Sequence, residues 1–242
     1  MGNNIFYFQG ILSMSMCYDD FIRRLKEERI NHQLTLRAMS KMVRVLPSHY
    51  LKIENGYNRL TFYELENICS TDLDIYYIFT GRRGMTGNRY EEVFKNAEVE
   101  QIICCLQAIH LIAGMKRKKG PYKGEWEQIY SHIKYLMYVD IGLADERNIF
   151  KAYREYNGVT QLSLAEDLGM DVKKLRLLEC DKVIPDSEII YKMYEKFDIS
   201  PSAFLRHKKC IQSEIAYLLN LYTGKVGDEL LVIVKTVMLF VE

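Results

Sequence analysis

The sequence predicts an all-α protein made of two copies of one helical unit, each followed by a helical hairpin. Apolar residues recur mainly at helical spacing, and the alternation typical of strands is scarce along the 242 residues. Two long segments also match each other without a gap at an offset of 125 residues, as between Leu25 and Phe150. So long a register indicates an internal repeat.

The first unit, residues 19–84, is expected to contain five short helices. Thr35 is a typical N-cap before the second of them, and Asn55-Gly56 is a typical stop after the third. Each helix carries one apolar stripe, which is enough for a small common core. The predicted helices cover residues 19–29, 35–43, 46–56, 61–69 and 74–81.

The second unit, residues 146–209, repeats the apolar pattern of the first. The register slips by one residue near its end, where Leu73 matches Ile199. We therefore expect the same order of helices in both units. Matched apolar positions include Leu34 with Val159, Met39 with Leu164, Val43 with Leu168, Tyr50 with Leu175, Ile53 with Leu178, and Leu65 with Ile190.

Both units place a Glu beside the most apolar positions of their third helix, and an Arg precedes it by 25 residues. A carboxylate buried among apolar residues is tolerated when a guanidinium meets it, ideally through two hydrogen bonds. We therefore predict two structural ion pairs, Arg29 with Glu54 and Arg154 with Glu179. The alternative is that both Glu side chains are solvated. The same spacing of 25 residues between Arg and Glu in both units argues against it.

The remaining segments, residues 85–145 and 210–242, each read as two helices joined by a loop. The first is expected to hold helices at 90–115 and 125–140. The loop between them begins with four basic residues, 116–119. These could complement the dipole at a helix C-terminus or could bind a nucleic acid. We expect the two hairpins to share one core. Its predicted members are Ile102, Leu106, Ile109, Ile133, Leu136, Ile215, Leu218, Leu231, Val234 and Met238.

Composition narrows the class of protein. The 33 Lys and Arg residues nearly cancel the 32 Asp and Glu residues, so net charge neither supports nor excludes a nucleic-acid partner. The six cysteines form no C-x-x-C pair and read as reduced thiols of a cytoplasmic protein. Residues 1–18 read as a tag-like or disordered segment. The apolar C-terminal stretch is interrupted by Lys235 and is too short to cross a bilayer, so no membrane partner is expected.

The paired units resemble the helix-turn-helix domain of the Cro and lambda-repressor-like family, of the xenobiotic-response-element type. The resemblance covers about half of the chain and implies a bacterial or phage-like DNA-binding transcriptional regulator. In the second unit it rests on Val159-Thr160-Gln161, Leu164-Ala165, Leu168-Gly169 and Leu178-Glu179. In the first it rests on Arg29, Leu34-Thr35, Ile53-Glu54-Asn55-Gly56 and residues 74–81.

The resemblance also implies which residues face double-stranded DNA, because the third helix of such a domain lies in the major groove. In the first unit these are Thr35, Pro47, Ser48, His49, Lys52, Asn55, Asn58 and Arg59; in the second they are Thr160, Gln161, Val172, Lys173, Lys174, Leu177 and Lys182. The threonines and Gln161 would hold phosphates at a helix start.

Departures from the family pattern keep a second function open. Leu36 stands where a phosphate-binding Gln is usual, Arg44 replaces a turn Gly, and Pro47 replaces a polar groove residue. The alternative is a protein-interaction adaptor or antirepressor with degenerate helix-turn-helix domains. No arrangement of residues supports an enzyme, a cofactor or a metal site.

The repeat implies that one chain supplies both halves of a dimer. Family dimers place their recognition helices about one DNA turn, roughly 34 Å, apart. An intrachain pseudo-dimer with unlike recognition helices would prefer an imperfect palindrome. A second copy of the chain stays open as a partner, since Val237 and Val241 could exceed what the internal core buries.

Overall fold

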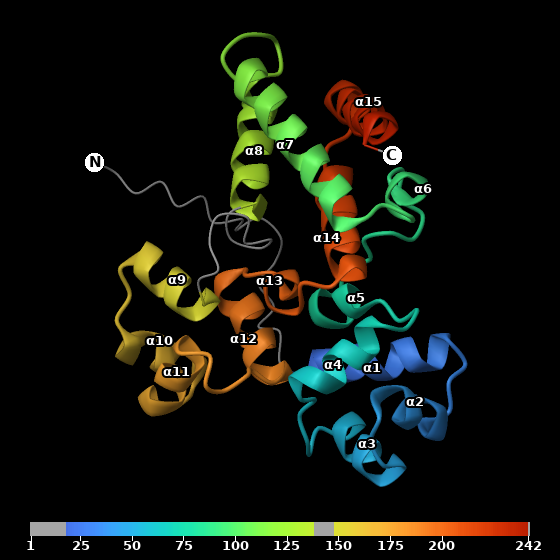
Figure 1. Ribbon diagram of the computed structural model, residues 1–242, viewed down its shortest axis with the longest axis vertical. Coiled ribbons are helices and arrows are strands. Elements are labelled where there is room, and N and C mark those ends of the chain that lie inside the picture. The colour runs from blue at the N-terminus through green and yellow to red at the C-terminus, as the bar shows by residue number, and fades with distance from the viewer. Residues whose placement is uncertain (1–17, 138–147, 242) are drawn as a thin grey trace.

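The computed structural model describes residues 18–137 and 148–241, and helices are the only regular secondary structure within these ranges (Figure 1). The all-α prediction is confirmed for this part of the chain. The tag-like segment up to Cys17 and residues 138–140 of the helix expected at 125–140 lie outside the described residues.

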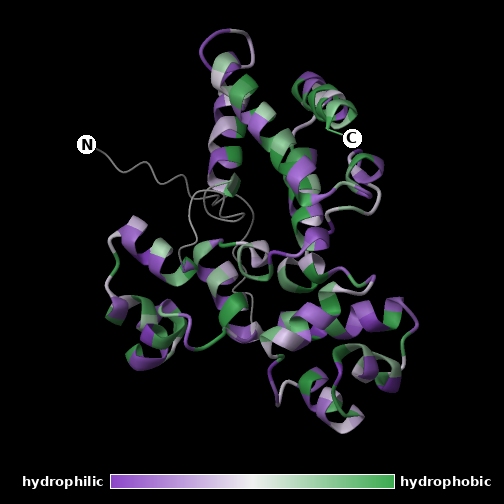
Figure 2. Cartoon of the chain, in the orientation of Figure 1, coloured by the Kyte–Doolittle hydropathy of each residue, from purple (hydrophilic) through white to green (hydrophobic). Residues whose placement is uncertain are grey.

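The first unit consists of helices α1 to α5. Thr35, Thr61 and Asp74 cap α2, α4 and α5, because their side-chain oxygens accept hydrogen bonds from backbone N–H groups one turn later. The predicted cap at Thr35 is therefore confirmed. Hydropathy alternates along these helices in Figure 2, as expected when each buries one face. The bounds are Tyr18–Asn31 for α1, Leu36–Val43 for α2, Pro47–Glu54 for α3, Phe62–Cys69 for α4 and Ile75–Thr80 for α5.

Helices α9 to α13 form the second unit, with similar local geometry at its start. Thr160 caps α10 as Thr35 caps α2, through its own hydroxyl and the N–H of Ser163. The residue that follows α2 is Arg44 and the one that follows α10 is Gly169, and their φ angles are left-handed, at 65° and 64°. The left-handed conformation costs an Arg about 1–2 kcal/mol more than a Gly. The bounds are Ile149–Asn157 for α9, Gln161–Leu168 for α10, Val172–Glu179 for α11, Ser187–Phe197 for α12 and Pro201–Leu205 for α13.

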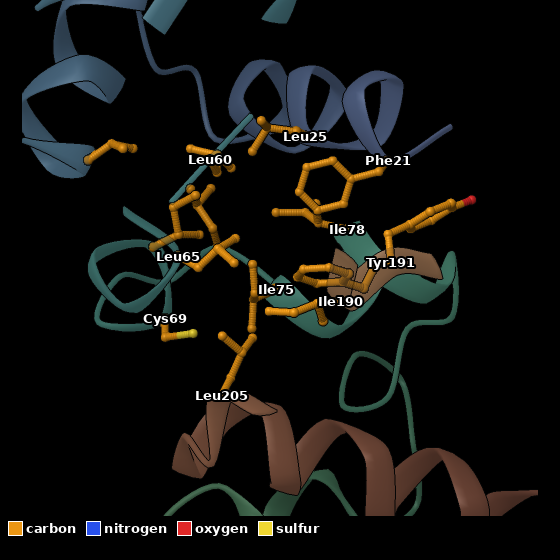
Figure 3. Packing of buried hydrophobic residues seen from close by; sticks show 14 of the residues in the cluster. Phe21, Leu25, Leu60, Leu65, Cys69, Ile75, Ile78, Ile190, Tyr191 and Leu205 are labelled. Atoms are coloured by element: carbon orange, nitrogen blue, oxygen red, sulfur yellow. The ribbon is translucent and has the colours of Figure 1, made fainter. Parts of the chain in front are cut away.

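Helix α12 joins the two units, because one of its faces packs in the core of the first unit and another packs in the core of the second. Ile189 and Met193 pack with α9 to α11 of their own unit. Ile190 and Tyr191 pack instead in the cluster of the first unit, beside Phe21 (Figure 3). The sequence pattern had paired Leu65 with Ile190 only as equivalent positions, whereas the structure puts both in one core.

A buried hydroxyl adds polar contacts to this interface. Ser187 Oγ lies 2.6 Å from the Tyr18 hydroxyl and accepts a hydrogen bond of 3.1 Å from the backbone N–H of Leu60. The N–H of Ser187 in turn donates to the carbonyl of Leu60 at 2.9 Å. Because these groups are out of contact with solvent, the bonds favour one relative orientation of the units.

The two hairpins share one core, as the sequence predicts. All ten expected residues belong to it; Leu218, Leu231 and Met238 are its partly buried members. Figure 1 shows the hairpins together at one end of the molecule, above the two units. Helix α14 begins two residues before the expected boundary at 210. The bounds are Glu91–Phe94 for α6, Val99–Lys116 for α7, Lys123–Tyr135 for α8, Lys208–Asn220 for α14 and Gly224–Phe240 for α15.

The single helix expected at 90–115 is wrong, since the chain breaks between α6 and α7. Gln212 of α14 donates through Nε2 to the carbonyls of Phe94 and Ala97, at 2.7 and 2.9 Å. The carbonyl of Phe94 also accepts from the backbone N–H of Ala97 at 3.0 Å, so Gln212 adds a second bond there and supplies a partner for the carbonyl of Ala97. A residue more than a hundred positions away in the chain thus stabilises the break.

Two of the four basic residues at 116–119, where α7 ends and the loop begins, pair with acidic residues. Lys116 pairs with Glu229, and Arg117 pairs with Glu127 at 2.8 Å. Trp126 is buried in the hairpin core under Lys116. Among the described residues, α7 alone is long and apolar enough to cross a membrane by length and composition; here it packs against α8 and α15.

Stability should decline at mildly acidic pH because of His132. Burial lowers the pKa of this imidazole, whose Nδ1 lies 2.5 Å from the Tyr222 hydroxyl. The unfolded chain takes up a proton near the ordinary pKa of about 6.5, whereas the folded protein does so only at lower pH. This stabilisation is therefore present above pH about 6.5 and is lost as the pH falls. Denaturant unfolding at about pH 7.5 and 5.5 should show it.

The variant His132→Gln keeps a hydrogen-bonding group without the titration. It should lose part of the pH dependence between those two values. Burial also lowers the pKa values of His110 and His207, which contribute to the pH dependence in the same direction. An unchanged pH dependence in this variant would contradict the assignment to His132.

Candidate nucleic-acid interface

The two predicted ion pairs are confirmed, and each ties the first helix of a unit to its third. Arg29 Nε and Nη2 donate to the two carboxylate oxygens of Glu54 at 2.6 and 3.0 Å. Arg154 meets Glu179 in the same way, at 2.7 and 3.3 Å. Both Glu side chains are buried, so the pairs hold α3 and α11 at a fixed angle to the unit.

Gln161 belongs to the second of these pairs rather than to a free surface. Its Nε2 donates to Glu179 at 2.7 Å, and its Oε1 accepts from Arg176 at 3.1 Å. Burial alone would raise the pKa of Glu179, but hydrogen bonds from Arg154 and Gln161 outweigh it and lower that pKa. The carboxylate is thus charged, and Gln161 already has partners where the sequence resemblance implies a phosphate.

Most of the residues expected at DNA in the first unit lie on the outer side of α3. Pro47, Ser48, Lys52 and Asn55 are exposed. Thr35 is also exposed, although its hydroxyl accepts the capping bond. His49 and Asn58 are half-buried and lie 3.3 Å apart, Nδ1 to Nδ2; His49 Nε2 is 3.7 Å from Glu64.

In the second unit the corresponding helix, α11, presents positive charge. Lys173, Lys174 and Lys182 are exposed and have no ion-pair partner among the described residues, while Val172 and Leu177 are half-buried beside them. Asp171 caps the helix by accepting from the N–H of Lys173 at 2.7 Å. Thr160 is exposed at the start of α10.

Arg59, expected to contact the DNA backbone, is engaged between the two units. Its Nε donates to Glu188 of α12 at 2.6 Å, and its Nη1 donates to the carbonyl of Gly56 at 2.6 Å. The guanidinium also lies 4.5 Å from the ring centre of Tyr18. These contacts assign Arg59 to the interface with α12.

Substitution of Arg59 and Glu188 can separate an interface role from a DNA role. Arg59→Ala and Glu188→Ala should each cost about 1 kcal/mol of stability, and the double variant should cost less than their sum. Denaturant unfolding of the four proteins measures this coupling. If the two costs are additive, Arg59 and Glu188 do not stabilise the interface as a pair. If Arg59 instead contacts a DNA phosphate, Arg59→Ala alone should lower the salt slope of DNA binding.

The sequence reading missed a basic stripe on α2. Arg37, Lys41 and Arg44 are exposed, and no ion pair involves them among the described residues. Arg37 and Lys41 are four residues apart and so share one face of α2, and Arg44 follows directly after the helix with a left-handed φ of 65°. That spacing was visible in the sequence and could have identified the stripe.

Comparison with models of protein families, with curated proteins and with solved structures finds no match to this chain.

Proposed function

We propose that the protein is a DNA-binding transcriptional regulator, repressor-like in type, with two helix-turn-helix domains in one chain. The observation that carries the proposal is the pair of surfaces at corresponding positions of the two units, α2–α3 and α10–α11. Each is held by a buried Arg–Glu pair, and each presents cations without acidic partners. Lys and Arg side chains of this kind neutralise DNA phosphates and release counterions, which favours binding.

The arrangement of the units also supports an intrachain pseudo-dimer. The hairpins share one core, and α12 packs against α1 and α5 of the first unit. In Figure 1, α3 and α11 lie in different units, both at the end of the molecule away from the α7–α8 loop. Two recognition helices in one chain could contact two half-sites without a second copy.

The alternative is a protein-interaction adaptor or antirepressor, and exposed apolar residues around α3 favour it. Leu46 and Tyr57 are 72% and 79% exposed at the two ends of this helix. Aromatic side chains such as that of Tyr57 are enriched at protein interfaces. The choice between the two functions therefore depends on whether intact protein selects a DNA sequence.

A selection from randomised duplex oligonucleotides tests the proposal directly. The full chain, at low salt, should enrich an imperfect palindrome whose half-sites are about one helical turn apart. Enrichment of no sequence would reject DNA-binding regulation and favour the adaptor.

Salt dependence tests the residues. Lys52→Ala and Lys173→Ala should each weaken binding and lower the slope of log K against log salt by roughly one unit, if the side chain contacts a phosphate. Lys118→Ala, in the exposed α7–α8 loop, is the matched control and should leave the slope unchanged. Equal salt slopes in all three variants would show that neither Lys52 nor Lys173 contacts a DNA phosphate.

A further inference from the structure

The two candidate DNA surfaces differ in where their charge lies. On α11, Lys173, Lys174 and Arg176 are exposed; at the equivalent positions of α3, 125 residues earlier, stand Ser48, His49 and Leu51. Helix α3 keeps a single exposed cation, Lys52, where α11 has the half-buried Leu177. The helix expected in the groove is therefore basic in the second unit and nearly neutral in the first.

The preceding helices show the opposite difference. Helix α2 exposes Arg37 and Lys41, whereas the equivalent positions of α10 hold Leu162 and Glu166, both exposed. Asp167 adds a second exposed carboxylate to α10. Phosphate would be repelled by the outer face of α10 and attracted by that of α2.

We propose that the two units divide the task of binding DNA, an inference that rests on the proposed function. The second unit anchors the protein through the cations of α11. The first reads base edges through the neutral face of α3, while the cations of α2 hold the flanking phosphates. Each unit thus carries its phosphate-binding charge on a different helix.

Because the two units contact DNA through different kinds of side chain, they should differ in how strongly they select a base sequence. Lysine contacts to phosphate position a protein and carry no sequence information. Apolar side chains such as Leu46, Pro47 and Leu51 discriminate by contact with the thymine methyl group in the major groove. The preferred duplex therefore has one selective, thymine-containing half-site and one tolerant half-site.

Matched substitutions separate the two roles. Lys173→Ser, which installs the residue found at the equivalent position of α3, should lower the salt slope by roughly one unit and leave the base preferences unchanged. Leu51→Ala should leave the slope unchanged and flatten the preference in the selective half-site. Both positions are exposed, so neither change disturbs the core.

Chemically altered DNA provides an independent measurement. Replacing thymine by deoxyuracil in the selective half-site removes only the methyl group. It should weaken binding of the unaltered protein by about fourfold, the value of one buried methyl group, and should weaken binding by Leu51→Ala less, because that variant has already lost one of the apolar contacts. The same replacement in the tolerant half-site should have no effect on either protein.

The outcomes are distinct. Two equally selective half-sites, or a change of base preference in Lys173→Ser but none in Leu51→Ala, would overturn the division while leaving DNA-binding regulation intact. Failure of the unaltered protein to select any sequence would overturn the proposed function and this inference together.

Discussion

Replacing Arg29 by Ala is expected to destabilise the protein by about 3 kcal/mol. The substitution leaves the carboxylate of Glu54, whose side chain is only 3% exposed, without the two hydrogen bonds that now neutralise it. It also frees the carbonyl of Leu34, which accepts from Arg29 Nη1 at 2.8 Å. Denaturant unfolding measures the loss, and Arg154→Ala should behave alike in the second unit.

Arg23→Ala is the appropriate control. Its side chain is 56% exposed and pairs only with Asp20 and Glu27 on the same helix, so its loss should cost less than about 1 kcal/mol. Equal stability of Arg23→Ala and Arg29→Ala would remove the argument that the buried pair matters.

The neighbouring Arg24 is not a suitable control, although the helical pattern predicts a surface position. It is 3% exposed and donates from Nε and Nη2 to the carbonyls of Ile78 and Phe79, at 2.8 and 2.7 Å. These acceptors lie in the short helix α5. Arg24 is therefore a structural residue.

The second large effect is expected at Gly84, in the segment between α5 and α6. A Cβ atom there would lie 1.8 Å from the carbonyl oxygen of Ser213 in α14. Because that oxygen belongs to the backbone, the helix and the segment would have to separate. Gly84→Ala should therefore cost on the order of 3 kcal/mol and lower the thermal midpoint.

Gly124→Ala is the matched control for this change. Gly124 lies within α8, and no heavy atom stands within 4 Å of the position of its Cβ. Alanine should stabilise this helix by up to about 1 kcal/mol. Thermal unfolding of both variants should shift in opposite directions, and a Gly84→Ala protein as stable as the parent would refute the close contact.

The buried carboxylates show which ion pairs a repeated spacing can predict and which it cannot. Glu54 and Glu179 were identified because each has an Arg at the same distance along the chain. Glu28 is just as buried and was not identified, since its partner Arg83 lies 55 residues away and occurs only in the first unit. A single pair without a repeat leaves no pattern in one sequence.

The all-α class, several helix starts and the two Arg–Glu pairs were predictable from the amino-acid sequence. These features depend on local chemistry: a hydroxyl reaches N–H groups one turn later, and a stripe of apolar residues requires a helix with one buried face. The shared core of the hairpins followed from the same stripes, because four apolar faces in one chain need partners.

The residues that cover each apolar face come from distant parts of the chain and were not predictable. The apolar residues of α12 predict burial but not that Ile190 and Tyr191 enter the core of the other unit. In the sequence Arg59 has no evident acidic partner, and only the fold brings Glu188 beside it. The break before α7 is likewise stabilised by the distant Gln212. Hydrophobic burial is non-directional, so a sequence pattern shows that a side chain is covered and leaves its partner to the packing of distant segments.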